Sequence, residues 1–405
     1  MTDYAHQVAG VRSPRPFKIR RLGHIAIDMD SPSTLDFYVR DLGLRINDVL
    51  DPKNIPGLET IAAQSPRPLV YFTSPGSDHH TVVLVPRQIG LARRGEAVPA
   101  DITNGQISFQ VSSLREITQA KAYLEQQGIT VPRIGRDMPG SNWHMYFQNS
   151  DFLTVELYYG MEQAGWMQRS KPLSMYYRRV AGEFTLPQEP EYTEVEEALA
   201  RGLDITAGHR HEDPQALSFD VGGIRLPRPF RIHRLGPVGF FVRNLKASAD
   251  LYSRQLGLQV TEAFDFEGQS CAFLRCGTDH PCLALYSYEL RDKLGLTSRS
   301  SNFFVGFELG GYDQLVAAGR FLKSQGWQVN SAPWPELHPG IDRALHVTDP
   351  EGNIVLLYYY MEQIGWDGRP SGTRHADRTP FEAWPDSIEG RSDVYCDAPL
   401  MGPLG

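Results

Sequence analysis

Two ionisable side chains interrupt apolar segments in the first half of this sequence. His24 lies in Leu-Gly-His-Ile-Ala-Ile, and Glu156 lies in Leu-Thr-Val-Glu-Leu-Tyr-Tyr. A carboxylate buried in such a strand costs free energy unless a cation or another polar partner accompanies it. Imidazole and carboxylate groups bind divalent metals and transfer protons, so both residues are candidates for a metal or acid–base site. Taken alone, His24 is better explained as a hydrogen-bonded histidine of the core.

Further side chains with suitable chemistry stand at the start of two other apolar segments. His79 and His80 directly precede Thr-Val-Val-Leu, and Gln106 begins Gln-Ile-Ser-Phe-Gln-Val. Neighbouring residues of a strand point to opposite faces, so His79 and His80 would face opposite sides if the strand has begun there. Paired histidines also occur at exposed turns, and a glutamine can be an ordinary polar residue of a strand. A common scaffold is needed before these groups can act together.

The scaffold is visible as an internal repeat. Four blocks of the first half return in the same order in the second half, which indicates duplication of a unit of about 150 residues. The matched blocks are residues 10–24 with 223–237, 37–44 with 251–258, 76–80 with 277–281, and 157–166 with 357–366.

Each repeat shows a strand–helix–strands pattern twice. In the first repeat the pattern predicts a helix that begins near Ser31-Pro32-Ser33, with proline in its first turn, and ends at Leu42-Gly43. A second helix is predicted over residues 114–127, with Gly128 as its stop. The predicted strands cover residues 22–29, 69–72, 81–85, 106–111, 144–147 and 154–159.

The repeats divide the chain into four segments. We expect an N-terminal domain over residues 1–166 that carries the active site, and a C-terminal domain over residues 222–366. A linker over residues 167–221 contains one predicted short helix, residues 193–202, with acidic residues in its first turn. Residues 367–405 form a tail that contains proline, glycine and aspartate.

The order and spacing of these blocks resemble the vicinal-oxygen-chelate superfamily, also known as the glyoxalase/bleomycin-resistance/dioxygenase fold. Two such units in one chain are similar to the type I extradiol ring-cleavage dioxygenases, over residues 18–166 and 230–366. The resemblance implies an α+β fold with two tandem domains. Each domain would contain two paired βαβββ modules that form an open, barrel-like sheet with outer helices. It further implies a non-haem Fe(II) enzyme that cleaves a catechol-like aromatic substrate with O2, and a homo-oligomer.

The resemblance also assigns roles to residues of the N-terminal repeat. The metal ligands fall on His24, Glu156 and Gln106, where the family places two histidines and one carboxylate. The acid–base histidine falls on His80, beside His79, and the substrate-binding tyrosine falls on Tyr146, ten positions before Glu156. His144 is close enough in sequence to Tyr146 to reach the same site.

Gln106 departs from the family pattern because a histidine is expected at its position. Its amide oxygen is neutral, as imidazole is, but it is a harder and weaker donor for iron. Some glyoxalase- and epimerase-like relatives are similar in using a glutamine ligand. An alternative function therefore keeps the metal, as Fe(II), Mn(II) or another divalent ion, but catalyses isomerisation or lyase chemistry without O2. A third possibility is a protein that binds an aromatic ligand without turnover.

The second repeat provides an internal control. Its counterparts of His24, His80, Gln106 and Glu156 are Pro237, Pro281, Phe304 and Leu356, all apolar. A protein core tolerates these replacements, whereas a metal site does not. The sequence therefore predicts one site, in the N-terminal repeat, and a C-terminal repeat that is structural or forms a wall of the substrate channel.

Composition excludes several other classes of protein. The 405 residues carry a formal net charge of −8, which disfavours nucleic acid and anionic membranes as partners. No apolar segment approaches the roughly 18 residues that span a bilayer. The first residues contain no apolar signal-peptide region, so we expect a cytoplasmic protein.

Overall fold

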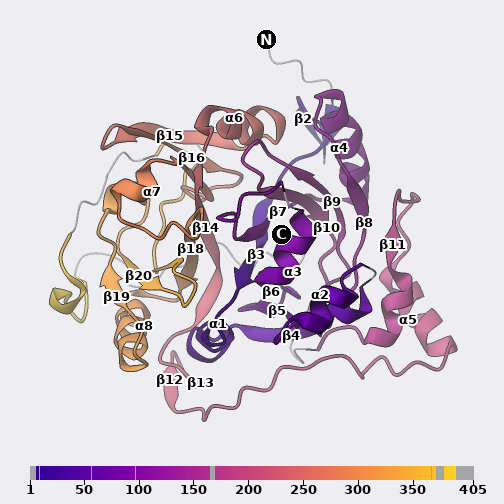
Figure 1. The fold of residues 1–405 in the computed structure, drawn as a ribbon, viewed down its shortest axis with the longest axis horizontal. Helices are drawn as coiled ribbons and strands as arrows, with labels where there is room; N and C mark the ends of the chain where they lie inside the picture. Colours follow the sequence, from indigo (N-terminus) through magenta and orange to yellow (C-terminus); the bar gives the residue numbers. More distant parts are fainter. Residues whose placement is uncertain are drawn as a thin grey trace.

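The computed structural model describes residues 6–388, except residues 9, 56, 96, 165–168, 366 and 371–377. Most of the predicted tail lies outside the described residues. Two large mixed sheets stand side by side, with the N-terminal repeat in indigo to purple and the C-terminal repeat in orange (Figure 1). None of the helices in the described ranges is long and apolar enough to cross a membrane.

The N-terminal sheet has nine strands in the order β11-β8-β9-β10-β7-β3-β6-β5-β4. Its central strands are β3 and β7, which pair antiparallel, and each has a parallel neighbour, β6 and β10. The strands are β3 (Arg21–Met29), β4 (Arg45–Leu50), β5 (Val70–Ser74), β6 (Val82–Pro86), β7 (Asn104–Gln110), β8 (Arg133–Arg136), β9 (Trp143–Gln148), β10 (Thr154–Tyr159) and β11 (Val180–Ala181).

The C-terminal sheet repeats this topology in the order β15-β16-β17-β14-β18-β21-β20-β19. Its central pair is β14 and β18, with β17 and β21 as parallel neighbours. The strands are β14 (Ile232–Val242), β15 (Gln259–Phe266), β16 (Gln269–Arg275), β17 (Leu283–Ser287), β18 (Asn302–Leu309), β19 (Val329–Ser331), β20 (Ala344–Thr348) and β21 (Ile354–Tyr358). Each sheet is thus two βαβββ modules joined along their first strands, which confirms the predicted fold.

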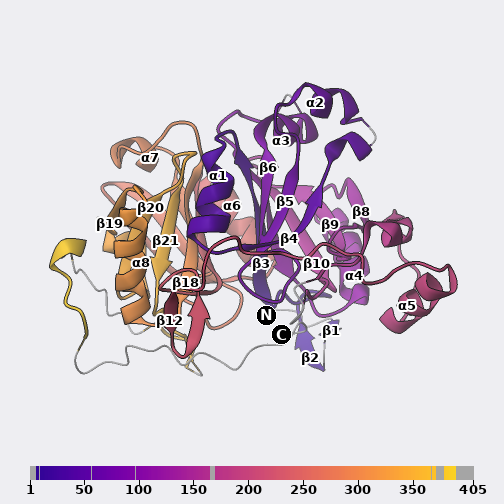
Figure 2. The ribbon, with the colours of Figure 1, turned by 90° about the horizontal axis from the view of Figure 1, so that it is seen from below.

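Helices follow the first strand of each module and lie outside the sheets (Figure 2). The first repeat contains α1 (Ser33–Leu35), η1 (Asp36–Asp41), η2 (Pro52–Asn54), α2 (Glu59–Gln64), α3 (Arg87–Arg94) and α4 (Leu114–Gln126). The second contains α6 (Leu245–Asp250), η4 (Leu251–Gln255), α7 (Leu290–Lys293), α8 (Tyr312–Ser324) and η5 (Pro335–Leu337), followed by η6 (Phe381–Ala383). The segment between the sheets contains η3 (Leu173–Arg178) and α5 (Glu191–Ala200). Two small hairpins, β1 (His6–Val8) with β2 (Val11–Ser13) and β12 (Phe219–Val221) with β13 (Ile224–Leu226), precede the repeats.

The first predicted helix differs from the structure in its winding. Residues 33–35 form an α-helical turn, and residues 36–41 continue as a π-helix, in which the Leu42 amide donates to the Phe37 carbonyl. Both Phe37 and Tyr38 are fully buried as a result. Gly43 ends the helix in the left-handed region that glycine adopts readily, as predicted.

The two faces of the N-terminal sheet differ in chemistry. Ile25, Ile107 and Leu157 belong to a large apolar core on the outer face, and this core is continuous with that of the second repeat. Ring contacts such as Phe37 with Trp327 join the two repeats. Residues that alternate with these, among them His24, face the inner side. The inner face therefore carries the polar residues, next to a smaller apolar cluster that contains Ala26 and Val83.

The repeated Pro-Arg-Pro-Phe motif joins the two repeats. Arg15 Nη1 donates to the Arg254 carbonyl at 3.1 Å, and Arg228 Nη1 donates to the Arg40 carbonyl at 2.6 Å. Each arginine thus binds the end of the first helix in the other repeat, where a free carbonyl is available. This reciprocal contact gives the motif a structural role, unrelated to a catalytic site.

Candidate metal centre

Four neighbouring strands bring polar residues into one row on the inner face of the N-terminal sheet. His24 of β3 lies opposite Ser108 of β7. Glu156 of β10 lies opposite Ser108 on one side and Tyr146 of β9 on the other. Gln106 precedes Ser108 by two residues, so its side chain shares that face.

Three side chains of this row converge on one point. The distance from His24 Nε2 to Glu156 Oε2 is 2.7 Å, and the Gln106 amide nitrogen lies 3.0 Å from His24 Nε2 and 2.9 Å from Glu156 Oε2. Ligand atoms on one face of an octahedral ion, each about 2.1 Å from the metal, are also separated by about 3 Å. Rotation of the Gln106 amide by half a turn places its oxygen, a metal donor, where the nitrogen now lies. The donor set therefore fits a divalent ion.

Burial and charge favour an ionised carboxylate at this point. The side chains of His24 and Glu156 are both fully buried. Burial by itself raises the pKa of Glu156, but the charge and hydrogen bond of His24, with further contributions from His144 and Ser108, bring the pKa down to about 2. Asn142 also donates to Glu156 Oε1 at 2.9 Å. The site holds a negative charge in place, as a cation-binding site requires.

The set contains only two residues of the usual ligand types. In the part of the chain that the structure describes, no group of three or more His, Cys, Asp or Glu side chains is arranged to hold a metal ion. The third donor here would be the amide of Gln106. As it stands, His24 and Glu156 also form a buried hydrogen-bonded pair, which is the metal-free interpretation of the same geometry, although His24 Nδ1 has no hydrogen-bond partner among the described residues.

His80 lies against the convergent set, and His79 lies one step away. The rings of His80 and His24 pack with centroids 4.4 Å apart. His79 contacts His80 through the two Nδ1 atoms, which are 3.0 Å apart. Burial, followed by the nearby His24 and His79, lowers the pKa of His80 well below its usual value. His80 is therefore neutral at pH 7, the form that accepts a proton.

Tyr146 and His144 occupy the other side of Glu156. The Tyr146 ring lies 4.7 Å from the His144 ring and 5.0 Å from the Arg133 guanidinium. Burial, with the carboxylates of Glu156 and Asp137, raises the pKa of Tyr146 well above its usual value, so its hydroxyl remains a donor. His144 Nδ1 is 4.0 Å from Glu156 Oε1, and burial lowers its pKa. All seven residues singled out in the sequence thus lie in one region.

Three residues near this region were missed in the sequence. Asn142 binds Glu156, Asp48 of β4 lies 3.5 Å from His79, and the Tyr158 ring packs 4.8 Å from the His24 ring. The sequence does contain a signal for Tyr158, because its counterpart Tyr358 recurs in the second repeat. Each tyrosine packs on a glycine two strands away, Gly23 or Gly236, where a Cβ would overlap the tyrosine hydroxyl. No sequence signal marks Asn142 or Asp48.

The segment after the first repeat spans the two edges of the N-terminal sheet. β11 pairs with β8 at one edge, whereas the Tyr176 hydroxyl of η3 donates to Asp48 of β4 at the other edge, at 2.5 Å. Residues 169–221 are here called the connecting segment, and its part from Tyr176 to Ala181 bridges these two edges on the open side of the sheet.

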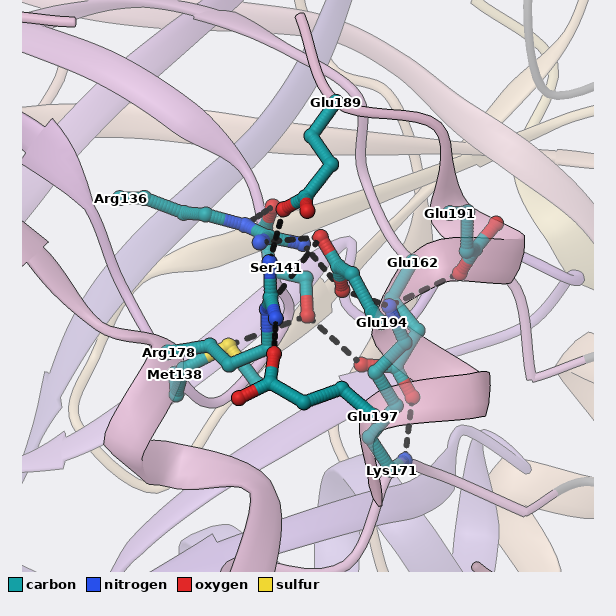
Figure 3. A network of polar contacts seen from close by, with 10 residues as sticks. All are labelled: Arg136, Met138, Ser141, Glu162, Lys171, Arg178, Glu189, Glu191, Glu194 and Glu197. Atoms are coloured by element: carbon teal, nitrogen blue, oxygen red, sulfur yellow. Dashed lines mark hydrogen bonds and ion pairs between the residues drawn. The ribbon is translucent and has the colours of Figure 1, made fainter. Parts of the chain in front are cut away.

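A buried polar network fixes the connecting segment to the site (Figure 3). Arg136 of β8 donates to both carboxylate oxygens of Glu194 in α5, at 2.6 and 3.1 Å. The Lys171 amide donates to Glu162 Oε1 at 2.5 Å, and Ser141 Oγ donates to Glu162 Oε2 at 3.4 Å. Ser141 directly precedes Asn142, which binds Glu156. Glu162 thus has a structural role in this network.

At the positions that correspond to Gln106 and Glu156, the inner face of the C-terminal sheet is apolar. Phe304 and Leu356, the counterparts of Gln106 and Glu156, are buried in a cluster with Phe303 and Tyr286. His346 lies opposite Leu356, as Tyr146 lies opposite Glu156, and contacts His338. Among the residues that the structure describes, no carboxylate or amide stands at the positions of the N-terminal donor set. This contrast agrees with a single candidate site.

A family model matches most of the C-terminal repeat. Residues 234–357 match the model of the Glyoxalase/Bleomycin resistance protein/Dioxygenase superfamily. The C-terminal repeat thus matches the vicinal-oxygen-chelate superfamily, and the N-terminal repeat has the same strand topology. A comparison with curated proteins finds no significant match.

Solved structures extend the likeness to both repeats. The chain is similar to the 2,3-dioxygenase LapB from Pseudomonas sp. KL28, with a TM-score of 0.56 at 16% identity over 87% of this chain and 96% of that chain. It is similar to homoprotocatechuate 2,3-dioxygenase from Arthrobacter globiformis, with 0.52 at 14% over 88% and 84%. It is also similar to a Mn(II)-bound glyoxalase from Novosphingobium aromaticivorans, with 0.51 at 14% over 87% and 85%. At these low identities, the TM-scores and the coverage of both chains show a shared fold alone.

Proposed function

We propose that this protein is a metal-dependent extradiol-type dioxygenase that cleaves a catechol-like aromatic ring with O2. The observation that carries the proposal is the convergence of three side-chain atoms, which lie 2.7–3.0 Å from one another. These atoms are His24 Nε2, Glu156 Oε2 and the Gln106 amide nitrogen. The similarity to two 2,3-dioxygenases supports the reaction class.

Each residue near the centre has a role in this function. His24, Glu156 and Gln106 would hold Fe(II), which when bound lowers the pKa of a substrate hydroxyl and brings O2 and the diol together. Neutral His80, packed against His24, is placed to accept the proton of that hydroxyl and to return it later. Tyr146 keeps its proton and can donate a hydrogen bond to a substrate oxygen beside Glu156.

Gln106 supports one alternative function for the same centre. An amide oxygen binds Fe(II) more weakly than imidazole, and one structural neighbour is a Mn(II)-bound glyoxalase. The alternative is a metal-assisted isomerase or lyase that needs no O2. The two functions share the donor set and differ in whether O2 is consumed.

Elemental analysis of anaerobically purified protein tests the proposed centre. We expect about one divalent ion per chain, lost in His24→Ala and in Glu156→Gln because each removes a donor. His346→Ala, a buried histidine of the C-terminal repeat, is the matched control and keeps the metal. A metal-free wild type, or full occupancy in both variants, would refute the site and leave a protein that binds its ligand without a metal.

Oxygen uptake then separates the two functions. With iron bound, a set of catechols presented in an oxygen electrode should consume O2 and yield the ring-cleaved product, with both lost in His24→Ala. A metal-loaded protein that consumes no O2 with any catechol would contradict ring cleavage and favour the isomerase or lyase.

A further inference from the structure

A carboxylate and two imidazoles form a chain that ends at the candidate centre. Asp48 Oδ2 lies 3.5 Å from His79 Nε2, and His79 Nδ1 lies 3.0 Å from His80 Nδ1. The His80 ring then packs against His24. All four side chains are buried, and Asn47 fixes the backbone of His79 by donating to its carbonyl at 2.9 Å. Water therefore has little part in deciding which nitrogen of each ring carries the proton.

The order of donors and acceptors in this chain follows from Asp48. The Asp48 carboxylate is 3.5 Å from His79 Nε2, which is longer than a normal hydrogen bond, and among the described residues no other hydrogen-bond partner faces Nε2. The negative charge favours the His79 ring proton on Nε2, the nitrogen nearer to it, over Nδ1. Its Nδ1 is then an acceptor, and His80 Nδ1 must be the donor of the 3.0 Å contact. The other nitrogen of His80, Nε2, is left with a lone pair. We propose that Asp48 is a positioning residue which, through His79, holds His80 in the tautomer whose Nε2 can accept a proton at the centre.

The C-terminal repeat shows what is specific to this arrangement. There Glu262 of β15 takes the place of Asp48, and its Oε1 lies 2.9 Å from Nε2 of His280, the counterpart of His79. His280 Nδ1, however, contacts the Thr261 hydroxyl at 2.9 Å, and the next residue is Pro281. A carboxylate thus faces this imidazole in both repeats, at hydrogen-bond distance in the C-terminal repeat and at 3.5 Å in the N-terminal repeat. Only in the N-terminal repeat does it face a second imidazole beside the candidate metal ligands.

The catalytic importance of this tautomer rests on the proposed function, but the tautomer itself does not. Nitrogen chemical shifts of the histidine rings report it directly in full-length, chelator-treated protein labelled with 15N-histidine. The His80 resonances are assigned by their loss in His80→Gln. We expect wild-type His80 to carry its proton on Nδ1. A His80 protonated on Nε2 would overturn the proposal whatever the metal or the activity.

Variants of Asp48 show whether this residue fixes the tautomer of His80. Asp48→Leu removes the acceptor, and His80 should then lose its single tautomer, whereas Asp48→Asn keeps an oxygen for His79 and should restore it. Glu262→Leu removes the equivalent carboxylate of the C-terminal repeat and should leave the His80 shifts unchanged. An unchanged His80 in Asp48→Leu, or the same change in Glu262→Leu, would assign Asp48 a structural role only.

Once metal binding and O2 consumption have been demonstrated, the turnover number of the variants provides a second measurement. Asp48→Leu should lower kcat by about 10²-fold, the scale of lost acid–base catalysis, with metal content and KM little changed. Glu262→Leu should keep its kcat. If the tautomer result holds and no turnover is found with any substrate class, the proposed function fails and the assignment of the tautomer stands.

Discussion

Gln106 occupies the position at which the family resemblance predicts a histidine, and its amide still reaches both other candidate ligands. The reason is the register of β7, which places residue 106 on the same face as Ser108, between β3 and β10. An amide oxygen carries no formal charge, so the electrostatics of the donor set match those of the family. The difference lies in the strength of the third metal–ligand bond, which is weaker for an amide oxygen than for an imidazole nitrogen.

Substitution of Gln106 tests its part in metal binding. Gln106→Leu should weaken Fe(II) binding by at least about 10-fold, the scale on which even outer-shell groups act, and Gln106→His should strengthen it. Anaerobic titration with Fe(II) measures both. Gln110→Leu, on the same face of β7 but bound to Arg21, is the control and should bind as wild type does. Equal affinity in Gln106→Leu and wild type would exclude Gln106 as a ligand.

The connecting segment depends on buried charges to stay across the open side of the N-terminal sheet. β11 alone contributes two residues to the sheet, which is too short a strand to hold the segment in place. Arg136 and Glu194 are both nearly buried and form a two-bond ion pair between β8 and α5. Removal of one partner leaves the other charge buried, and this is costly.

Arg136→Met is accordingly expected to destabilise the protein. Loss of one partner of a buried pair costs about 3–5 kcal/mol, and the value here should be near the lower end because Lys171 and Arg178 still face Glu194. Urea unfolding measures the loss, and limited proteolysis should show faster cleavage in the connecting segment. Arg201→Met, which breaks an exposed pair with Glu197, should cost less than about 1 kcal/mol. Equal stability of the two variants would contradict the anchoring role of Arg136.

The two repeats exchange contacts symmetrically, so the molecule behaves as one packed body. Asp151 of the first repeat accepts the Asn244 amide and the Ser248 hydroxyl at the start of α6. Glu351 of the second repeat accepts the Ser31 amide and the Thr34 hydroxyl at the start of α1. Carboxylates at helix N-termini satisfy amides that lack partners within the helix. The repeats thus cap each other's first helices.

A buried acid at this junction makes stability depend on pH. Asp349 accepts the Tyr38 hydroxyl at 3.0 Å, and burial raises its pKa from 3.8 to about 6, despite hydrogen bonds from Asn353 and Tyr38 that lower it. The folded protein therefore binds this proton more tightly than the unfolded chain. The resulting stabilisation is complete below about pH 4 and is lost as pH rises through about 6.

Asp349→Asn should remove this pH dependence. Two pKa units correspond to about 3 kcal/mol, so the free energy of unfolding of wild type relative to the variant should fall by up to that amount between pH 4 and pH 7. Urea unfolding across this range measures the difference. Asp292→Asn, at an exposed position, serves as the control and should show no such trend. A constant difference between wild type and Asp349→Asn would show that Asp349 ionises normally.

The sequence by itself determined the duplication, the four βαβββ modules and the strands that carry the polar residues. The predicted strand over residues 154–159 coincides with β10, and the predicted helix over residues 114–127 differs from α4 by one residue. These features are encoded locally, because the period of apolar residues and the glycines that end helices act over a few neighbours. The repeat adds a second copy of each signal, and the apolar counterparts in the second copy indicate which half carries the candidate site.

Only the tertiary structure decided which distant groups meet at that site. The sequence does not predict β4, because Asn47 and Asp48 interrupt the alternation of apolar residues in Arg45–Leu50. For the same reason it does not identify Asp48, the carboxylate that faces His79. Asn142 and the connecting segment likewise reach the site through contacts between residues far apart in the chain. Such contacts depend on how strongly a sheet curves and on which of its edges come together. Neither property can be predicted from the spacing of residues along one strand.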